Sequence, residues 1–368
     1  MQDTSSLYAG QQGRGRDAAA PTEIPAAGWK DILYRLFRSI NNDRILLTSA
    51  GVTFYMLLAL VPTLTSVVAI YGLFNSTTDV ANQVDLLVGL VPPGGLEIIR
   101  DQLTRLTTES SRTLSFTLVI STAIALWSAS AGVKAMFEAM NIAYHEQERR
   151  PFLKLQLIAL LFTLGGAVAA IMVLATVVIL PAIIALLPTT GGFEWVVRVT
   201  SYAVMLLVVW LSIAAIYRWG PSREEAKWRW ITPGAVLAVV LLGATSIAFS
   251  WYVTNFSDYN RTYGSLGALI ALLTWLWISV TLVILGAELN SEVEHQTARD
   301  STTGPEKPLG ERGAHMADHV GRVWPWDRKK LEKPPKPPAE RRPLPWSSLA
   351  FSAPAAWLLG RARKRGRS

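Results

Sequence analysis

The sequence has no cysteine and little charge. Of its 368 residues, 17% are charged and 51% are hydrophobic, whereas about 25% of the residues in a soluble domain are charged. Without cysteine the chain has no disulfide bonds, no thiolate catalysis and no cysteine-based zinc site. The low charge and the high apolar content together predict a membrane protein.

Motifs of the common enzyme classes are also missing. No HExxH pattern, no GxxxxGK[ST] phosphate loop and no GxSxG nucleophile elbow occurs. His315 and His319 have the spacing of one helix face, but they lie in a part of the chain expected to be disordered. The sequence therefore predicts no enzyme activity, no cofactor and no bound metal.

The net charge of +8 is unevenly distributed along the chain. From Arg299 onward there are 16 Lys or Arg and 7 Asp or Glu, whereas the rest of the chain has 19 and 20. The basic character belongs to the C-terminal tail, so we expect no nucleic-acid binding by the body of the protein. A basic tail on an apolar body is typical of contact with anionic lipid of the inner leaflet. A tail that is only solvated is the alternative.

Long apolar runs occupy most of the remaining sequence. A transmembrane helix needs about 20 apolar residues, and six runs meet that length. An all-α, polytopic membrane protein with six transmembrane helices is therefore predicted. The runs cover approximately residues 46–74, 113–133, 154–187, 196–217, 233–253 and 265–287.

Basic residues are concentrated in alternate connections between these runs. Residues 29–45, just before the first run, and the connections 134–153 and 218–232 each carry three or four Lys or Arg. The other connections carry fewer for their length. The positive-inside rule then predicts that both termini lie in the cytoplasm, which agrees with an even number of spans.

Three segments lie outside the predicted spans. Residues 1–28 lack an apolar core and predict a disordered leader, and residues 299–368, rich in proline and basic residues, predict a disordered cytoplasmic tail. A short helix is predicted in the first outer loop, with an apolar stripe of Leu96, Ile99, Leu103 and Leu106.

A further helix is predicted just before the first run. Its apolar stripe lies opposite Lys30, Asp31, Arg35 and Arg38, which is typical of an amphipathic helix at the membrane surface. A helix packed on the cytoplasmic face of the protein itself is equally compatible. The stripe comprises Trp29, Ile32, Leu33, Leu36, Phe37 and Ile40.

Two positions in the apolar runs are candidates for a transport pathway. Pro62 interrupts the first run, where a proline kinks the helix, so it marks either a broken helix that lines a site or a packing kink. Glu288 closes the sixth run, near the inner interface. A carboxylate inside the membrane is functional by default, whereas one at the interface is mostly structural, and both alternatives stay open.

The stretch DYNRTYGSLGA, residues 258–268, separates the fifth and sixth runs. Turn-forming residues, tyrosines at the outer aromatic belt and a helix start at Gly264 and Ser265 explain it structurally. Its polar groups also lie beside a helix N-terminus, where anions are favoured, which gives recognition or gating as the alternative. The candidate pathway or gating residues here are Asn255, Tyr259, Asn260, Arg261, Tyr263, Gly264 and Ser265.

Four stretches resemble the YihY/virulence factor BrkB family, which also carries an older ribonuclease label. They are AGVTFYMLLALVP (50–62), LWSASAGVKAMFEAMNIAYHEQERRPF (126–152), SWYVTNFSDYNRTYGSLGALIALLTWLWIS (250–279) and LGAELN (285–290). The resemblance covers residues 29–298 and implies a multi-pass protein of the inner (plasma) membrane with a six-helix body. It implies no defined molecular mechanism.

Three functions are compatible with these observations. The leading interpretation is a transporter, channel or flippase-like protein of the cell envelope, with the solute and the oligomeric state left open. The alternative is a non-transporting envelope scaffold, whose tail and amphipathic helix recruit partners or lipid. A membrane-bound ribonuclease is least favoured, because the region of the resemblance has neither a His/Asp cluster for a metal nor the basic charge.

Overall fold

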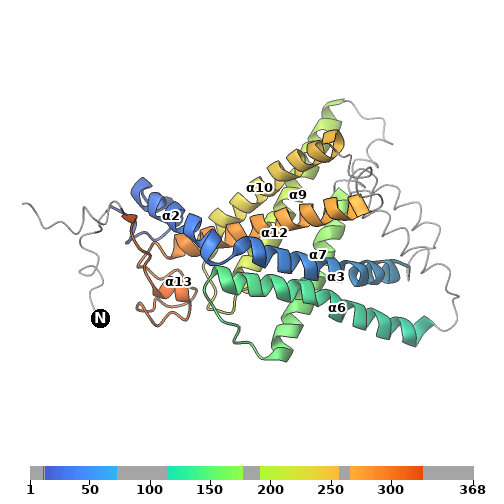
Figure 1. Ribbon diagram of the computed structural model, residues 1–368, viewed down its shortest axis with the longest axis horizontal. Helices are drawn as coiled ribbons and strands as arrows, with labels where there is room; N and C mark the ends of the chain where they lie inside the picture. Colours follow the sequence, from blue (N-terminus) through green and yellow to red (C-terminus); the bar gives the residue numbers. More distant parts are fainter. Residues whose placement is uncertain (1–10, 12, 73–113, 177–190, 257–265, 326–368) are drawn as a thin grey trace, which may run out of the picture. The chain divides into compact units, whose positions relative to one another are not determined.

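The structure, a computed structural model, describes residues 11, 13–72, 114–176, 191–256 and 266–325. Within this part the only strand pairing is an isolated bridge between Ala226 and Thr302. The chain divides into two compact units, Met1–Arg322 and Val323–Ser368, and residues 323–325 are the described part of the second. Figure 1 shows the helices η2 (Pro21–Glu23), α2 (Ala26–Asn42), α3 (Ile45–Gly72), α6 (Leu114–Ala143), α7 (Phe152–Leu174), α9 (Gly191–Trp219), α10 (Trp228–Phe256), α12 (Leu266–Glu294) and α13 (His315–Asp318).

Four of these helices are long and apolar enough to cross a membrane. The spans are Phe152–Val173 in α7, Trp195–Trp219 in α9, Trp228–Val253 in α10 and Leu269–Glu294 in α12. They overlap the third to sixth predicted runs, so the prediction of an all-helical membrane protein is confirmed. α3 and α6 overlap the first two runs with 28 and 30 residues. The count of six crossings stays a prediction.

The outward faces of the spans are apolar. Large hydrophobic side chains are exposed along α7, α9 and α10, a pattern that would be unusual over this extent on a soluble monomer. In a bilayer these side chains contact lipid, which is as apolar as they are. They include Leu157, Leu161, Val168, Leu207, Leu211, Val240 and Ile247.

α12 is the central helix of the bundle. It packs against α2, α3, α6 and α10, and 33% of its span is buried, compared with 6% for the span of α10. The shared core is formed by buried side chains from five helices, α3, α6, α9, α10 and α12. Among them are Met140 of α6, Tyr217 of α9, Ala238 of α10 and Ile284 of α12.

Two glycines let the backbones of α10 and α12 touch. A Cβ added at Gly234 would overlap the carbonyl oxygen of Gly286, and one added at Gly286 would overlap the hydroxyl of Tyr217. The Tyr217 hydroxyl instead donates a hydrogen bond to the carbonyl of Val283 at 2.6 Å. Small residues at such crossings permit close helix packing in membranes.

The N-terminal segment packs on the body well before residue 29, where the predicted leader ends. Arg14 forms an ion pair with Asp31 of α2 at 2.8 Å. Arg16 donates to the carbonyl oxygens of Gln296 and Gly321, at 2.9 and 2.7 Å. The composition of residues 13–28 looked like that of a disordered leader because their contacts come from residues distant in the sequence.

α2 buries part of its charged side together with Ile32 and Leu36 of its apolar stripe, while Lys30 and Arg38 are exposed. Asp31 and Arg35, expected on the polar outer face, are buried, and Arg35 donates to the carboxylate of Glu292 on α12. Leu33 and Phe37 are 56% and 70% exposed. The prediction of a helix here is correct, but its faces are assigned by ion pairing as well as by hydropathy.

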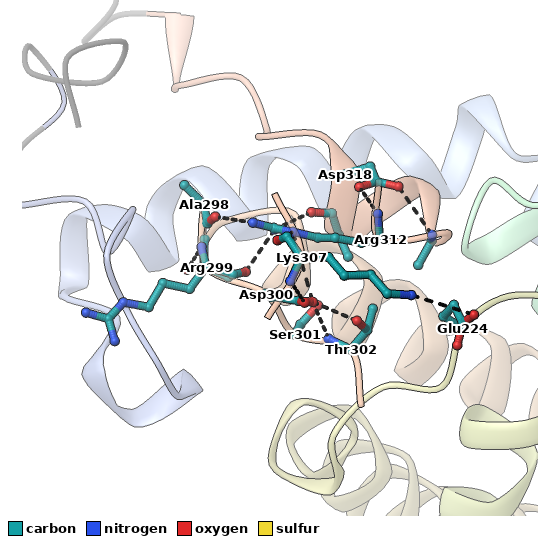
Figure 2. Close-up of polar contacts among 12 residues, drawn as sticks. Glu224, Ala298, Arg299, Asp300, Ser301, Thr302, Lys307, Arg312 and Asp318 are labelled. Atoms are coloured by element: carbon teal, nitrogen blue, oxygen red, sulfur yellow. Dashed lines mark hydrogen bonds and ion pairs between the residues drawn. The ribbon is translucent and has the colours of Figure 1, made fainter. Parts of the chain in front are cut away.

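Residues 299–322 also pack on the body, in a region where the sequence predicts a disordered tail. Arg312 donates to the carbonyl oxygens of Ala298 and Ala317, both at 2.6 Å, and to that of Arg299 at 3.0 Å (Figure 2). The carboxylate of Asp318 accepts from the backbone amides of Gly310, Arg312, Gly313 and Ala314. These local bonds fold a segment that has little apolar content of its own.

Candidate functional site

Charged and polar side chains are buried at one end of the bundle, where α2, the end of α12 and residues 299–322 meet. We call the region formed by residues 13–44, 141–150, 220–227 and 286–322 the polar end. The last two turns of α12 contribute several buried polar side chains to it, and four of them are Glu288, Asn290, Glu292 and Glu294. Burial of a carboxylate is costly unless it is paired and hydrogen-bonded, so the partners of each decide its role.

Three of these four side chains have partners from other elements. Asn290 Oδ1 accepts from the backbone amide of Gly234 at 2.7 Å. Glu292 accepts from the guanidinium of Arg35. Glu294 accepts two bonds from Arg223, at 2.8 and 2.9 Å, and one from the Ser301 hydroxyl at 2.9 Å.

Glu288 is the exception among them. Its side chain is fully buried, and neither carboxylate oxygen has a hydrogen-bond partner among the described residues. The charges that act on it are those of two further carboxylates, Asp43 and Glu292. A buried carboxylate surrounded by negative charge is costly in its ionised form, which sets Glu288 apart from its paired neighbours.

Tyr144 is the first residue after α6, and the charge of Glu288 acts on its hydroxyl. It is fully buried, and its hydroxyl interacts with the side chain of Asn290. Burial, followed by the charge of Glu294, raises the pKa of Tyr144 well above its usual range, although Arg223 over its ring at 4.6 Å opposes this. Tyr144 therefore stays neutral and offers a hydroxyl donor inside the site.

A second acidic group connects this interior to the surface. Asp43 ends α2, and its Oδ1 lies 3.5 Å from Nε2 of His145, with side chains 16% and 42% exposed. The interaction with Asp43 raises the pKa of His145 above its usual value. Asp43 Oδ2 is buried without a hydrogen-bond partner in the described part of the chain.

The backbone at His145 is held in a rare conformation. Its φ of 55° is left-handed, which costs a residue with a Cβ about 1–2 kcal/mol. Bonds from the amides of His145 to the Ile142 carbonyl and of Glu146 to the Asn141 carbonyl stabilise this turn. Such conformations persist where the surroundings enforce them, frequently at functional sites.

The structure places the sequence-predicted site residues unevenly. Glu288 is buried in the polar end, whereas Asn255 lies in the last turn of α10 and donates to the Trp251 carbonyl at 2.8 Å. At 1.5 Å per residue, Asn255 is about 30 Å along α10 from Gly234, which contacts the end of α12. Pro62 lies inside α3, which continues through it. Outside the described residues lie Tyr259, Asn260, Arg261, Tyr263, Gly264 and Ser265.

Sequence reasoning missed four residues of this site, Asp43, Tyr144, His145 and Asn290. Three of them lie in stretches that carry the family resemblance, NIAYHEQERRPF and LGAELN. The sequence signal that could have identified these three is a polar residue at a helix end, within a stretch that resembles the family. Among the described residues no group of three or more His, Cys, Asp or Glu could hold a metal ion.

Comparison with known proteins matches most of this unit. The sequence model described as Virulence factor BrkB matches residues 36–310. A ribonuclease-like protein YfkH of Bacillus subtilis is 30% identical over 66% of this chain and 88% of its own length. The UPF0761 membrane protein NT05HA_1801 of Aggregatibacter aphrophilus is 22% identical over 71% of this chain and 91% of its own. The UPF0761 membrane protein XCC0860 of Xanthomonas campestris is 29% identical over 70% of this chain and 59% of its own length. No solved structure matches.

Proposed function

Because the chain belongs to the Virulence factor BrkB family and its relatives are membrane proteins, we propose that it moves an ion or a small solute across the membrane. The observation that carries this proposal is Glu288, a fully buried carboxylate without a partner among the described residues, in a helix long enough to span. An ionisable residue in such a helix usually marks an ion or substrate path.

The proposal includes six membrane crossings with both termini in the cytoplasm of the inner (plasma) membrane. α3 and α6, with 28 and 30 residues, pack against each other and against α12. At 1.5 Å per residue each is more than 40 Å long, about ten ångströms more than the hydrocarbon core. The polar end then lies on the cytoplasmic side, where the basic connections are.

The direct test is ion flux into liposomes that contain the purified full-length protein. Glu288→Gln keeps the shape of the side chain and removes its charge, so we expect folded protein with flux lost. Glu311→Gln, at an exposed carboxylate in the same unit, is the matched control and should keep the flux of the parent. Flux through the parent that persists in Glu288→Gln would exclude a pathway role for this residue.

An envelope scaffold is the second candidate, favoured by one observation. The family match ends at residue 310, and the unit Val323–Ser368 lies beyond it. Deletion of residues 323–368 should abolish a scaffold phenotype and leave transport intact. The deletion has to begin after Arg322, because residues 299–322 pack on the body. The ribonuclease-like name belongs to the Bacillus relative, and the proposal for this chain rests on Glu288 instead.

A further inference from the structure

The outermost titratable group near Glu288 is His145. Its imidazole is partly exposed and faces Asp43 at the end of α2. Around it lie Glu146 from its own turn, Glu292 from α12, and the ring of His315 from α13, whose centroid is 5.6 Å away. Three of these four neighbours are carboxylates, so a proton arriving from water is attracted to this position.

Asp43 is the next group inward. One carboxylate oxygen meets His145, and the other is buried with no hydrogen-bond partner among the described residues. Its position is fixed by the C-terminal cap of α2, where its amide donates to Ser39 and Asn41. Asp43 therefore belongs to the solvent-facing pair, and its charge also acts on the buried Glu288.

Glu288 is the carboxylate of this region that is free to take up a proton. Glu292 and Glu294 are neutralised by Arg35 and Arg223, and His295 also lies 3.4 Å from Glu292. Glu288 has no comparable cation among the described residues. Protonation removes its charge and with it the cost of burial.

We propose that His145 and Asp43 form the entry of a proton path to Glu288, so that the proton is the ion this site binds; the inference rests on the transport function proposed above. His145 Nε2 takes a proton from water and passes it to Asp43. The resulting carboxylic acid gives its proton to Glu288, which becomes neutral. His145 and Asp43 return to their starting states, and one proton has moved inward.

The donor set suits a proton better than a metal ion. A metal needs several ligands that converge on one point, and the described residues offer no such group of three. A proton needs single acceptors in sequence, which the three side chains provide. The neutral hydroxyl of Tyr144 adds a donor beside the last acceptor.

The test is proton flux into liposomes containing the full-length protein, with imidazole as a chemical probe. His145→Asn is the informative variant, because asparagine tolerates the left-handed backbone and does not titrate. We expect it to lower proton flux by about 100-fold, the low end for a positioned proton-transfer group. Imidazole added to the buffer should restore much of that flux, since it reaches the exposed position of the lost ring.

Two further variants separate the path from general damage. Asp43→Asn should lose flux as His145→Asn does, without rescue, because imidazole cannot occupy a mostly buried position. His319→Asn removes an exposed ring that stacks on His315 and lies off the path, so it should keep the flux of the parent. Unchanged flux in His145→Asn, or a loss that imidazole leaves uncorrected, would overturn the entry path.

The outcomes distinguish this inference from the transport proposal. Flux of another ion that depends on Glu288, with no proton flux, overturns the proton and leaves transport standing. If no ion moves, transport fails, and infrared spectroscopy decides the proton site alone. A protonated carboxylic acid band that is present in the parent and missing in Glu288→Gln supports proton binding. Its absence from the parent overturns it.

Discussion

The spans of α7, α9 and α10 and the polar end are built on opposite rules. In the spans, large apolar side chains such as Leu161 and Ile247 face outward, because lipid accepts any apolar surface. In the polar end, many charged side chains face inward, and the buried ones other than Glu288 have specific partners. A span therefore tolerates many sequences, whereas the polar end depends on particular pairs.

The pairs of the polar end join distant parts of the sequence. Arg14 and Asp31 are 17 residues apart, Arg223 and Glu294 are 71 apart, and Arg35 and Glu292 are 257 apart. Removing one partner of a buried pair leaves an uncompensated charge and costs about 3–5 kcal/mol. Glu288 stands out because it lies in this region without such a partner among the described residues.

The largest loss of stability is expected from a substitution at Gly234, where the span of α10 meets the polar end. Gly234→Val places methyl groups against the Gly286 carbonyl and the Asn290 side chain. It should force α10 and α12 apart and cost about 3 kcal/mol or more. Gly243→Ala on the same helix is the control, since nothing lies within 4 Å of its added Cβ. Thermal unfolding of the purified protein measures both, and equal stability of the two variants would contradict a close contact.

A smaller, local effect is expected at Arg312, which holds residues 298–318 together. Arg312→Ala leaves several buried carbonyl oxygens without a donor, each costing about 1–3 kcal/mol. Hydrogen exchange should accelerate at the amides of Lys227 and Thr303, which bond Ser301 and Glu225 across the contact. The free energy of global unfolding should change less than the local exchange rates.

The control for this variant is Arg299→Ala. The Arg299 side chain is exposed and extends away from the Arg312 cluster in Figure 2. It should leave the exchange rates of Lys227 and Thr303 as in the parent. Exchange that stays slow in Arg312→Ala would show that the segment is held mainly by its other contacts, such as the bond from Ser301 to Glu294.

The same difference explains what could be predicted from the sequence. Apolar runs reveal spans because the signal lies within each run, so helices α7, α9, α10 and α12 were predicted close to their positions. α2 was predicted as a helix for the same reason. Its orientation was not predicted, because Asp31 and Arg35 are buried only by virtue of partners elsewhere in the chain.

Of the residues in the site, sequence reasoning identified Glu288 but not the side chains that surround it. Glu288 stood out as a carboxylate at the end of an apolar run, but its burial follows from the packing of α2 and residues 299–322 around it. Asp43 and His145 come from two different helix ends that only the fold brings to 3.5 Å. No local pattern encodes that distance.

The smallest change in stability is expected from His295 and His145 of the polar end, whose pKa values are shifted in opposite directions. Burial lowers the pKa of His295, so the unfolded chain takes up a proton more readily than the folded one. The stability tied to His295 is therefore present above about pH 6.5 and is lost as the pH falls through the lower folded pKa. For His145 the pKa is raised by Asp43, so its contribution is present below about pH 6.5 and is lost as the pH rises through the folded pKa.

Melting temperatures of His295→Gln and His145→Asn, each measured against the parent near pH 5 and near pH 8, test these signs. Relative to the parent, His295→Gln should gain stability at the lower pH, and His145→Asn should lose it there. Each difference should be at most about 2 °C, because roughly 1 kcal/mol shifts a large domain by only a few degrees. If His145→Asn also gained stability at the lower pH, the half-exposed His145 would have to be desolvated like His295. The polar end would then be closed to protons at the point where the path to Glu288 begins.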